Sequence, residues 1–139
     1  MRVLRQEWAR PMQNESQSLH MPYGQRGTLR EVQLLCGGVP WVFARTIIPY
    51  KTLTGRERRL AHLGNRPLGA VLFADRTMRR GPVQVACLQK GDAMFDWATQ
   101  GLTPRPTMIW GRRSVFYLRE KPLLVSEVFL PRILRCNCR

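Results

Sequence analysis

The alternation of apolar and polar positions along the chain predicts two antiparallel β-hairpins. Apolar and β-branched residues dominate the runs 28–36 and 40–49, and Gly37–Gly38 between them is a strong signal for a two-residue turn. Two further strand-like runs, 114–118 and 123–130, follow each other near the end of the chain and predict the second hairpin. The pattern therefore predicts a sheet built from antiparallel pairs.

Helical signals lie between the two hairpins. The run 51–64 has Thr54 and Glu57 at the spacing of a capping box and Gly64 in the position of a C-terminal cap. The other predicted elements are a strand over 1–10, a loop over 13–27, a short helix over 67–73, a strand over 82–88 and a helix over 92–99. We predict the α+β class, with helices covering one face of an antiparallel sheet. The chain shows no internal repeat and no linker, so we expect a single domain over residues 1–139.

Composition indicates a globular protein. The chain has 139 residues, 44% of them apolar, which is enough for one sizeable core. No apolar run approaches the roughly 20 residues that a membrane-spanning helix needs. The first residues also lack the apolar core of a secretory signal. We therefore expect a cytoplasmic protein.

The chain is strongly basic. It has 23 Lys and Arg against 9 Asp and Glu, a net charge of +14, and such an excess indicates affinity for polyanions. The arginines are dispersed, however, and no long basic run occurs. In WGRRS, residues 110–114, Trp110 could stack on a base beside two phosphate-binding arginines, but we favour a tight turn that enters a strand. A nucleic-acid binder remains an alternative, and a basic surface would also draw anionic metabolites towards a pocket.

Neither the cysteines nor the histidines indicate a metal site. The cysteines are Cys36, Cys87, Cys136 and Cys138. They are too scattered for a disulfide scaffold, and in a cytoplasmic protein we expect them to be reduced. Cys136 and Cys138 lack a second Cys/His pair at zinc-binding spacing, and His20 and His62 stand alone. We expect no metal ligands.

Arg30, Arg45 and Glu127 each share a strand face with apolar residues, because side chains alternate between the two faces of a strand. The apolar neighbours are Val32 and Leu34 beside Arg30, Trp41, Phe43 and Ile47 beside Arg45, and Leu123, Val125 and Phe129 beside Glu127. A buried charge is costly unless it is paired, so these three side chains could together form a pocket for an anionic ligand with a hydroxyl group. The alternatives are a structural Arg–Glu pair and misassigned strand faces.

Several stretches together resemble bacterial chorismate–pyruvate lyase, and they occur in the order of that family. They are LREVQLL at 29–35, PWVFARTIIP at 40–49, LGNRPLGAVLF at 63–73, WGRRS at 110–114 and KPLLVSEVFLP at 121–131. The resemblance implies an antiparallel sheet with flanking helices and a ligand enclosed away from solvent. It also implies conversion of chorismate to 4-hydroxybenzoate and pyruvate, the entry step to the ubiquinone ring, without a metal or other cofactor.

The resemblance also assigns roles to residues. By this similarity Arg30 would bind the ring carboxylate, the backbone N–H of Leu68 would bind the same carboxylate, and Glu127 would hydrogen-bond the ring hydroxyl. We expect Glu127 to act in addition as a general acid–base partner. On physical grounds we add Arg45, because chorismate carries a second carboxylate that another inward arginine could hold. Positioning and charge stabilisation would then accelerate a reaction that aromatisation drives.

The chain departs from the family pattern at its start. Members normally begin with a helical segment that includes a Ser-Met-Thr stretch, whose methionine contributes to the ligand pocket, and this sequence begins inside the first predicted strand. An alternative to the lyase is a non-catalytic effector-binding domain of the kind found in GntR-type repressors, which resembles the lyase in fold. We expect a monomer whose partners are chorismate and 4-hydroxybenzoate.

Overall fold

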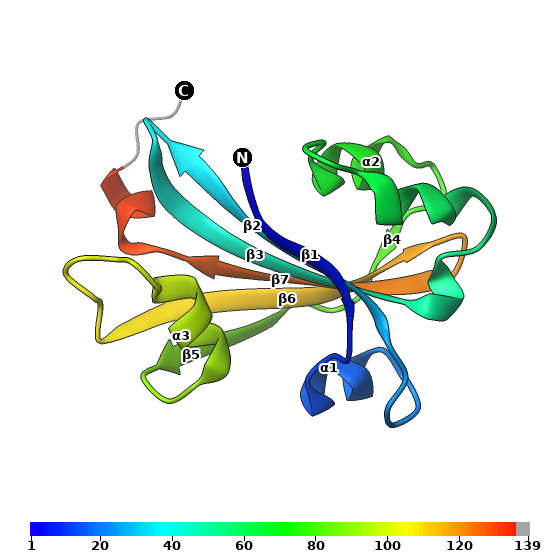
Figure 1. The fold of residues 1–139 in the computed structure, drawn as a ribbon, viewed down its shortest axis with the longest axis horizontal. Coiled ribbons are helices and arrows are strands. Elements are labelled where there is room, and N and C mark those ends of the chain that lie inside the picture. The colour runs from blue at the N-terminus through cyan, green and yellow to red at the C-terminus, as the bar shows by residue number, and fades with distance from the viewer. Residues whose placement is uncertain (136–139) are drawn as a thin grey trace.

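The part of the chain that the structure describes is built on an antiparallel sheet of seven strands (Figure 1). The computed structural model describes residues 1–135. The strands are β1 (Arg2–Ala9), β2 (Gly27–Cys36), β3 (Val39–Pro49), β4 (Arg79–Arg80), β5 (Gln84–Gln89), β6 (Met108–Leu118) and β7 (Lys121–Phe129). They lie in the order β1-β2-β3-β7-β6-β4, and β5 also pairs with β6. The predicted α+β class and both predicted hairpins are confirmed.

The two hairpin turns need backbone conformations of the left-handed region. Gly37 and Gly38 join β2 to β3 with φ values of +58° and +81°, which glycine adopts without a steric penalty. Arg119 and Glu120 join β6 to β7 with φ values of +50° and +63°. Strand β6 begins at Met108, well before the expected residue 114, because its first half pairs with β5.

Two of the predicted helical or loop segments differ from the structure. The segment expected as a loop contains helix α1 (Gln13–Ser18), whose buried Glu15 accepts the backbone N–H of Met12 at 2.8 Å. The helix expected over 51–64 is instead a pair of 3-10 helices, η1 (Tyr50–Thr52) and η2 (Gly55–His62).

The predicted capping box at this second segment does not form. Gly55 interrupts the helical path with φ +57°, and the Thr54 side chain caps no backbone N–H. The carboxylate of Glu57 is buried and pairs with Lys121 Nζ at 3.0 Å. The remaining helices are α2 (Leu68–Ala74), α3 (Ala93–Thr99) and η3 (Pro131–Arg135), and α2 and α3 lie where the sequence predicts them.

Helices cover both faces of the sheet, so the expectation of one covered face was wrong. On one face, here called the α2 face, η2 and α2 pack against a core that includes Ile48, Phe116 and Leu123. On the opposite face, here called the α3 face, α3 packs against Phe43 and Val128. Figure 1 shows α2 on one side of the sheet and both α1 and α3 on the other. The sheet therefore separates the core of the α2 face from the apolar clusters of the α3 face.

The cysteines differ in their redox state. Cys36 at the end of β2 is disulfide-bonded, so the expectation of reduced cysteines is wrong for this residue. Cys87 on β5 is an exposed free thiol. Cys136 and Cys138 lie outside the described residues.

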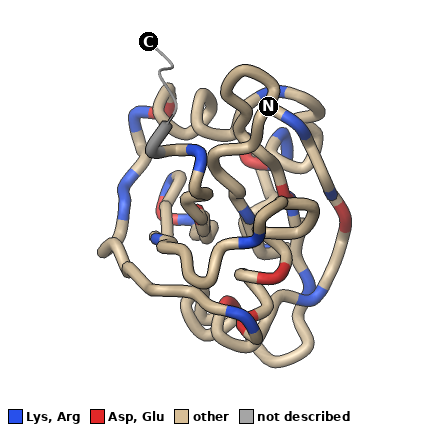
Figure 2. Tube along the Cα trace, turned by 90° about the vertical axis from the view of Figure 1, so that its left-hand side faces the viewer, with Lys and Arg blue, Asp and Glu red and all other residues tan. Residues whose placement is uncertain are grey.

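In the view of Figure 2 the Lys and Arg positions are spread around the molecule instead of forming one stripe.

Candidate functional site

A cavity of about 260 Å³ lies on the α2 face, between the sheet and α2. Arg30 on β2, Glu127 on β7 and Leu68 at the start of α2 all line it. Its apolar wall includes Val32, Leu34, Leu72, Phe116 and Val125. Three residues that the sequence nominated are thus brought together, in an apolar enclosure with a few convergent polar groups, which is the usual character of a small-molecule site.

Arg30 is buried, with 3% of its surface exposed, and protein oxygens fix its guanidinium. Nη1 donates to Oε1 of Gln6 and to the backbone oxygen of Gly64, both at 2.9 Å, and Nη2 donates to the backbone oxygen of Arg66 at 2.8 Å. Nε–H and the second Nη2–H have no acceptor, and no carboxylate pairs with Arg30, among the described residues. Burial lowers the pKa of this guanidinium because the charged form loses hydration. A fixed, buried cation without a counter-ion indicates an anion site.

Glu127 faces the same cavity from the other side of β3. Its Oε1 accepts a hydrogen bond from Nε of Arg112 at 3.1 Å, and 24% of its side chain is exposed. The Arg112 guanidinium also lies over the Phe129 ring, 5.4 Å from the centroid. Because one Arg112 bond occupies one carboxylate oxygen, the other oxygen remains able to accept a hydrogen bond from a ligand.

Leu68 contributes its backbone as well as its side chain. It is the first residue of α2, so its N–H has no partner within the helix. No oxygen of the described residues accepts from it outside the helix. The binding of a carboxylate by this N–H stays a prediction, and the position of Leu68 in the cavity wall agrees with it.

Arg45 does not lie in this cavity, so the expectation that it faces the same interior as Arg30 and Glu127 was wrong. It is opposite Glu31 in the β2–β3 register, on the α3 face. Its Nε and Nη2 donate to the two carboxylate oxygens of Glu15 at 2.8 and 3.0 Å, and Nη1 donates to Glu31 at 2.9 Å. The guanidinium also lies 4.4 Å from the centre of the Trp97 ring. Two carboxylates within the protein therefore balance the charge of Arg45.

The pKa of Arg45 agrees with this structural role. Burial on its own lowers the pKa, but hydrogen bonds from the guanidinium to Glu15 and then Glu31, with the charges of both carboxylates, outweigh burial and raise it. The pair of carboxylates therefore holds the charged form of Arg45 firmly in the core beneath α1.

A β-bulge explains why strand alternation misplaced Arg45. The register of β2 and β3 shifts between Leu34, which is opposite Val42, and Leu35, which is opposite Pro40. Trp41 is thus the extra residue on β3. Without the bulge, the register at Leu35 and Pro40 would continue and place Arg30 opposite Arg45. The extra residue moves every following side chain of β3 to the other face.

The structure adds polar residues that the sequence analysis missed. Arg80 on β4 and Arg112 on β6 line the cavity beside Glu127, and Nε of Arg80 donates to Ser114 Oγ at 3.1 Å. Gln6, opposite Arg30 in the β1–β2 register, holds the arginine from β1. Alternation along β6 could have found Arg112, because it shares a face with Ser114 and Phe116.

No group of His, Cys, Asp and Glu side chains is arranged to hold a metal ion in the part of the chain that the structure describes. Among the same residues, no helix combines the length and the apolar character needed to cross a membrane.

Comparisons with known proteins identify relatives across nearly the whole chain. A family model described as chorismate lyase matches residues 1–137. A relative named probable chorismate pyruvate-lyase, from Aromatoleum aromaticum, is 47% identical over 134 residues, which are 95% of this chain and 72% of the relative. A relative of the same name from Methylococcus capsulatus is 42% identical over 133 residues, 96% of this chain and 81% of the relative.

Solved structures share the fold at low sequence identity. The ligand-binding domain of a putative GntR-family transcriptional regulator from Bordetella bronchiseptica matches with a TM-score of 0.66 and 16% identity, over 94% of this chain and 82% of that one. The C-terminal domain of Yurk from Bacillus subtilis matches with a TM-score of 0.68 and 9% identity, over 94% of this chain and 90% of that one. At such identities the likeness shows the fold alone.

Proposed function

We propose a function and a site for this chain on the basis that it belongs to the chorismate lyase family. It converts chorismate to 4-hydroxybenzoate and pyruvate, the reaction that supplies the ubiquinone ring. The cavity on the α2 face is the site of this reaction. One observation carries that placement: a buried arginine with no carboxylate partner among the described residues faces an apolar enclosure that also contains Glu127.

Arg30 binds the ring carboxylate of the substrate. Its guanidinium is held from β1 and from the segment before α2, so it loses little freedom when a carboxylate binds. The N–H of Leu68 donates to the same carboxylate from the start of α2. Together these donors fix one end of the ring, and the apolar wall excludes water from its faces.

Glu127 binds the ring hydroxyl at the opposite end. In the reaction, the ring carbon that carries the hydroxyl loses a proton while the neighbouring carbon–oxygen bond to the side chain breaks. The electron pair of the C–H bond completes the aromatic ring, and the departing enolpyruvate takes up a proton to become pyruvate. Glu127 is the carboxylate that lines the cavity, so we assign it the general acid–base role.

The second carboxylate of chorismate requires a different partner from Arg45. Arg112 and Arg80 line the same cavity as Glu127, and their positive charges suit the enolpyruvyl group, which carries a carboxylate and whose ether oxygen gains negative charge as the carbon–oxygen bond breaks. Both guanidiniums keep N–H groups beyond their single hydrogen bonds to Glu127 and Ser114. We assign the enolpyruvyl carboxylate to these two arginines.

A direct assay tests the proposed function. Purified protein mixed with chorismate should produce 4-hydroxybenzoate, followed by its ultraviolet absorbance, and 4-hydroxybenzoate should raise the unfolding temperature of the protein. If neither product formation nor stabilisation by 4-hydroxybenzoate occurs, the function is wrong. Saturable binding without turnover would instead favour the non-catalytic effector-domain alternative.

The remaining expectations stay predictions. The monomeric state is one of them, and size-exclusion chromatography tests it. The cofactor-free reaction and the cytoplasmic location also stay predictions. Nucleic-acid binding would appear as steep, salt-dependent association with DNA or RNA, whereas binding of 4-hydroxybenzoate should depend only mildly on salt.

A further inference from the structure

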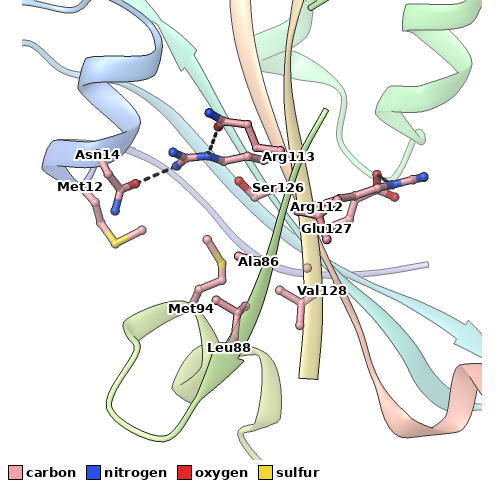
Figure 3. A pocket seen from close by; sticks show the side chains of 13 residues that line it. Met12, Asn14, Ala86, Leu88, Met94, Arg112, Arg113, Ser126, Glu127 and Val128 are labelled. Atoms are coloured by element: carbon pink, nitrogen blue, oxygen red, sulfur yellow. Dashed lines mark hydrogen bonds and ion pairs between the residues drawn. The ribbon is translucent and has the colours of Figure 1, made fainter. Parts of the chain in front are cut away.

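A second cavity, of about 410 Å³, opens on the α3 face of the sheet. It lies between α1 and α3, over β5, β6 and β7 (Figure 3). Figure 3 shows Met12 and Asn14 on one side of it and Ala86 and Val128 on the other. In the same view the paired side chains of Arg112 and Glu127 point away from this cavity, and both also line the first one. The sheet therefore separates the two cavities.

Arg113 is the cationic group of this second cavity. Its Nε donates to Gln84 Oε1 at 2.8 Å and its Nη1 donates to Asn14 Oδ1 at 3.0 Å. These bonds fix the guanidinium from β5 and from α1, and they leave one Nη1–H and both Nη2–H groups without an acceptor among the described residues. No carboxylate pairs with Arg113 in that part of the chain. The arginine is thus oriented by neutral amides and retains its full charge for an anion.

The rest of the second cavity is mainly apolar. Its floor and walls come from Ala86, Leu88, Met94 and Val128, together with Met12. Gly111 widens the floor, because a Cβ there would lie 3.3 Å from Leu88 Cδ1 and 3.1 Å from a backbone oxygen. Methionine sulfur makes favourable contacts with aromatic rings and adapts to the shape of a ligand. Beside Arg113, the hydroxyl of Ser126 has no hydrogen-bond partner among the described residues.

We propose that the α3-face cavity binds a small apolar monocarboxylate, with the carboxylate on Arg113 and Ser126 and the apolar group between Met12 and Met94. A single fixed guanidinium above an apolar floor matches one carboxylate on an apolar body, and the volume lies within the range of small-molecule sites. The proposal does not depend on the lyase reaction, since it uses the opposite face of the sheet.

Methionine methyl resonances test this proposal with reporters in both cavities. Met1 lines the first cavity, whereas Met12 and Met94 line the second. In protein carrying ¹³C-methyl methionine, with signals assigned by Met12→Leu and Met94→Leu, benzoate is the probe. Benzoate should shift the Met12 and Met94 signals saturably. A titration that moves Met1 alone, or that moves no signal, would overturn the proposal.

Charge variants locate the carboxylate. Arg113→Gln should raise the benzoate concentration at half-saturation of the Met12 and Met94 shifts by about tenfold or more, because a charge-assisted hydrogen bond is lost. Arg58→Gln removes the same charge from an exposed position on η2 that lines neither cavity, and it should leave that midpoint unchanged. Arg113→Lys keeps the charge without the planar fork and should weaken binding several-fold. Equal midpoints in wild type, Arg113→Gln and Arg113→Lys would contradict the assignment.

Discussion

Arg30 and Glu127 face one cavity from strands that only β3 separates. The β3 residues between them are small: Thr46 is opposite Arg30, and Ala44 is opposite Glu127. The two opposite charges do not collapse into an ion pair, because backbone and amide oxygens hold Arg30 and because Arg112 holds Glu127. The sheet thus keeps an anion site and a hydrogen-bond acceptor apart across an apolar gap before any ligand binds.

Removing the Arg30 guanidinium should abolish turnover and product binding in the α2-face cavity. In Arg30→Ala, the dissociation constant for 4-hydroxybenzoate should rise by about a hundredfold or more, because charge-assisted hydrogen bonds to the ring carboxylate are lost. Calorimetric titration with 4-hydroxybenzoate measures this. Arg30→Lys is the matched control, since it keeps the charge without the fork and should retain part of the binding.

The same variant also changes stability. Arg30→Ala leaves two backbone oxygens without their donor, so it should lower the free energy of unfolding by about 1–3 kcal/mol. Urea denaturation followed by circular dichroism measures the loss and shows that the variant is folded. Full lyase activity in folded Arg30→Ala would remove Arg30 from the site.

Replacing the Glu127 carboxylate with an amide should separate catalysis from binding. Glu127→Gln keeps an oxygen that can accept the Arg112 hydrogen bond, so the fold and the affinity for 4-hydroxybenzoate should change little. The kcat for chorismate should fall by about 10²–10⁴-fold, because the amide cannot take up a proton. Steady-state kinetics measure kcat. An unchanged kcat would show that Glu127 only positions the substrate.

The arginines beside Glu127 should recognise chorismate but not its product. Arg112→Gln should raise KM for chorismate by about tenfold, because a charge-assisted contact to the enolpyruvyl carboxylate is lost. The affinity for 4-hydroxybenzoate should stay nearly the same, since the product carries one carboxylate. Arg58→Gln removes an exposed arginine from η2 as a charge control. A fall in kcat with unchanged KM would mean that Arg112 acts only through Glu127.

Local signals in the sequence predicted most strands of this fold but missed a helix. The glycines of the first hairpin do have the positive φ that their turn signal implies, so the ends of β2 and β3 could be located. Helix α1 has the polar composition of a loop, QNESQS, and a buried ion pair between Glu15 and Arg45 holds it. Those two residues are distant in sequence, and local composition carries no information about such a contact.

The sequence predicted the positions of Arg30 and Glu127 but not that of Arg45. Alternation along one strand placed Arg30 and Glu127 correctly in apolar surroundings, because it needs only the strand itself. Deciding whether two strands present the same face requires their register, and the bulge at Trp41 sets that register. Tryptophan is common in β-strands, so nothing in the local sequence indicates the bulge that moves Arg45 to the opposite face.

Replacing Arg45 should therefore destabilise the protein without weakening ligand binding in the α2-face cavity. Arg45→Met leaves the carboxylates of Glu15 and Glu31 facing each other in the core without their cation. Breaking a buried ion network from one side costs about 3–5 kcal/mol in free energy of unfolding, which urea denaturation measures. Because Arg45 lines the opposite face of the sheet, the folded fraction of the variant should bind 4-hydroxybenzoate with nearly wild-type affinity.

Neutralising the two partners of Arg45 distinguishes this account from a direct role in substrate binding. With Glu15→Gln and Glu31→Gln added to Arg45→Met, no uncompensated charge stays buried, so part of the lost stability should return, and the three changes should be strongly non-additive. A direct role predicts the reverse pattern, in which stability is kept and chorismate binding is lost. That pattern would contradict the network around Arg45. Its guanidinium already donates charge-assisted hydrogen bonds to two carboxylates, and binding a third would require breaking them.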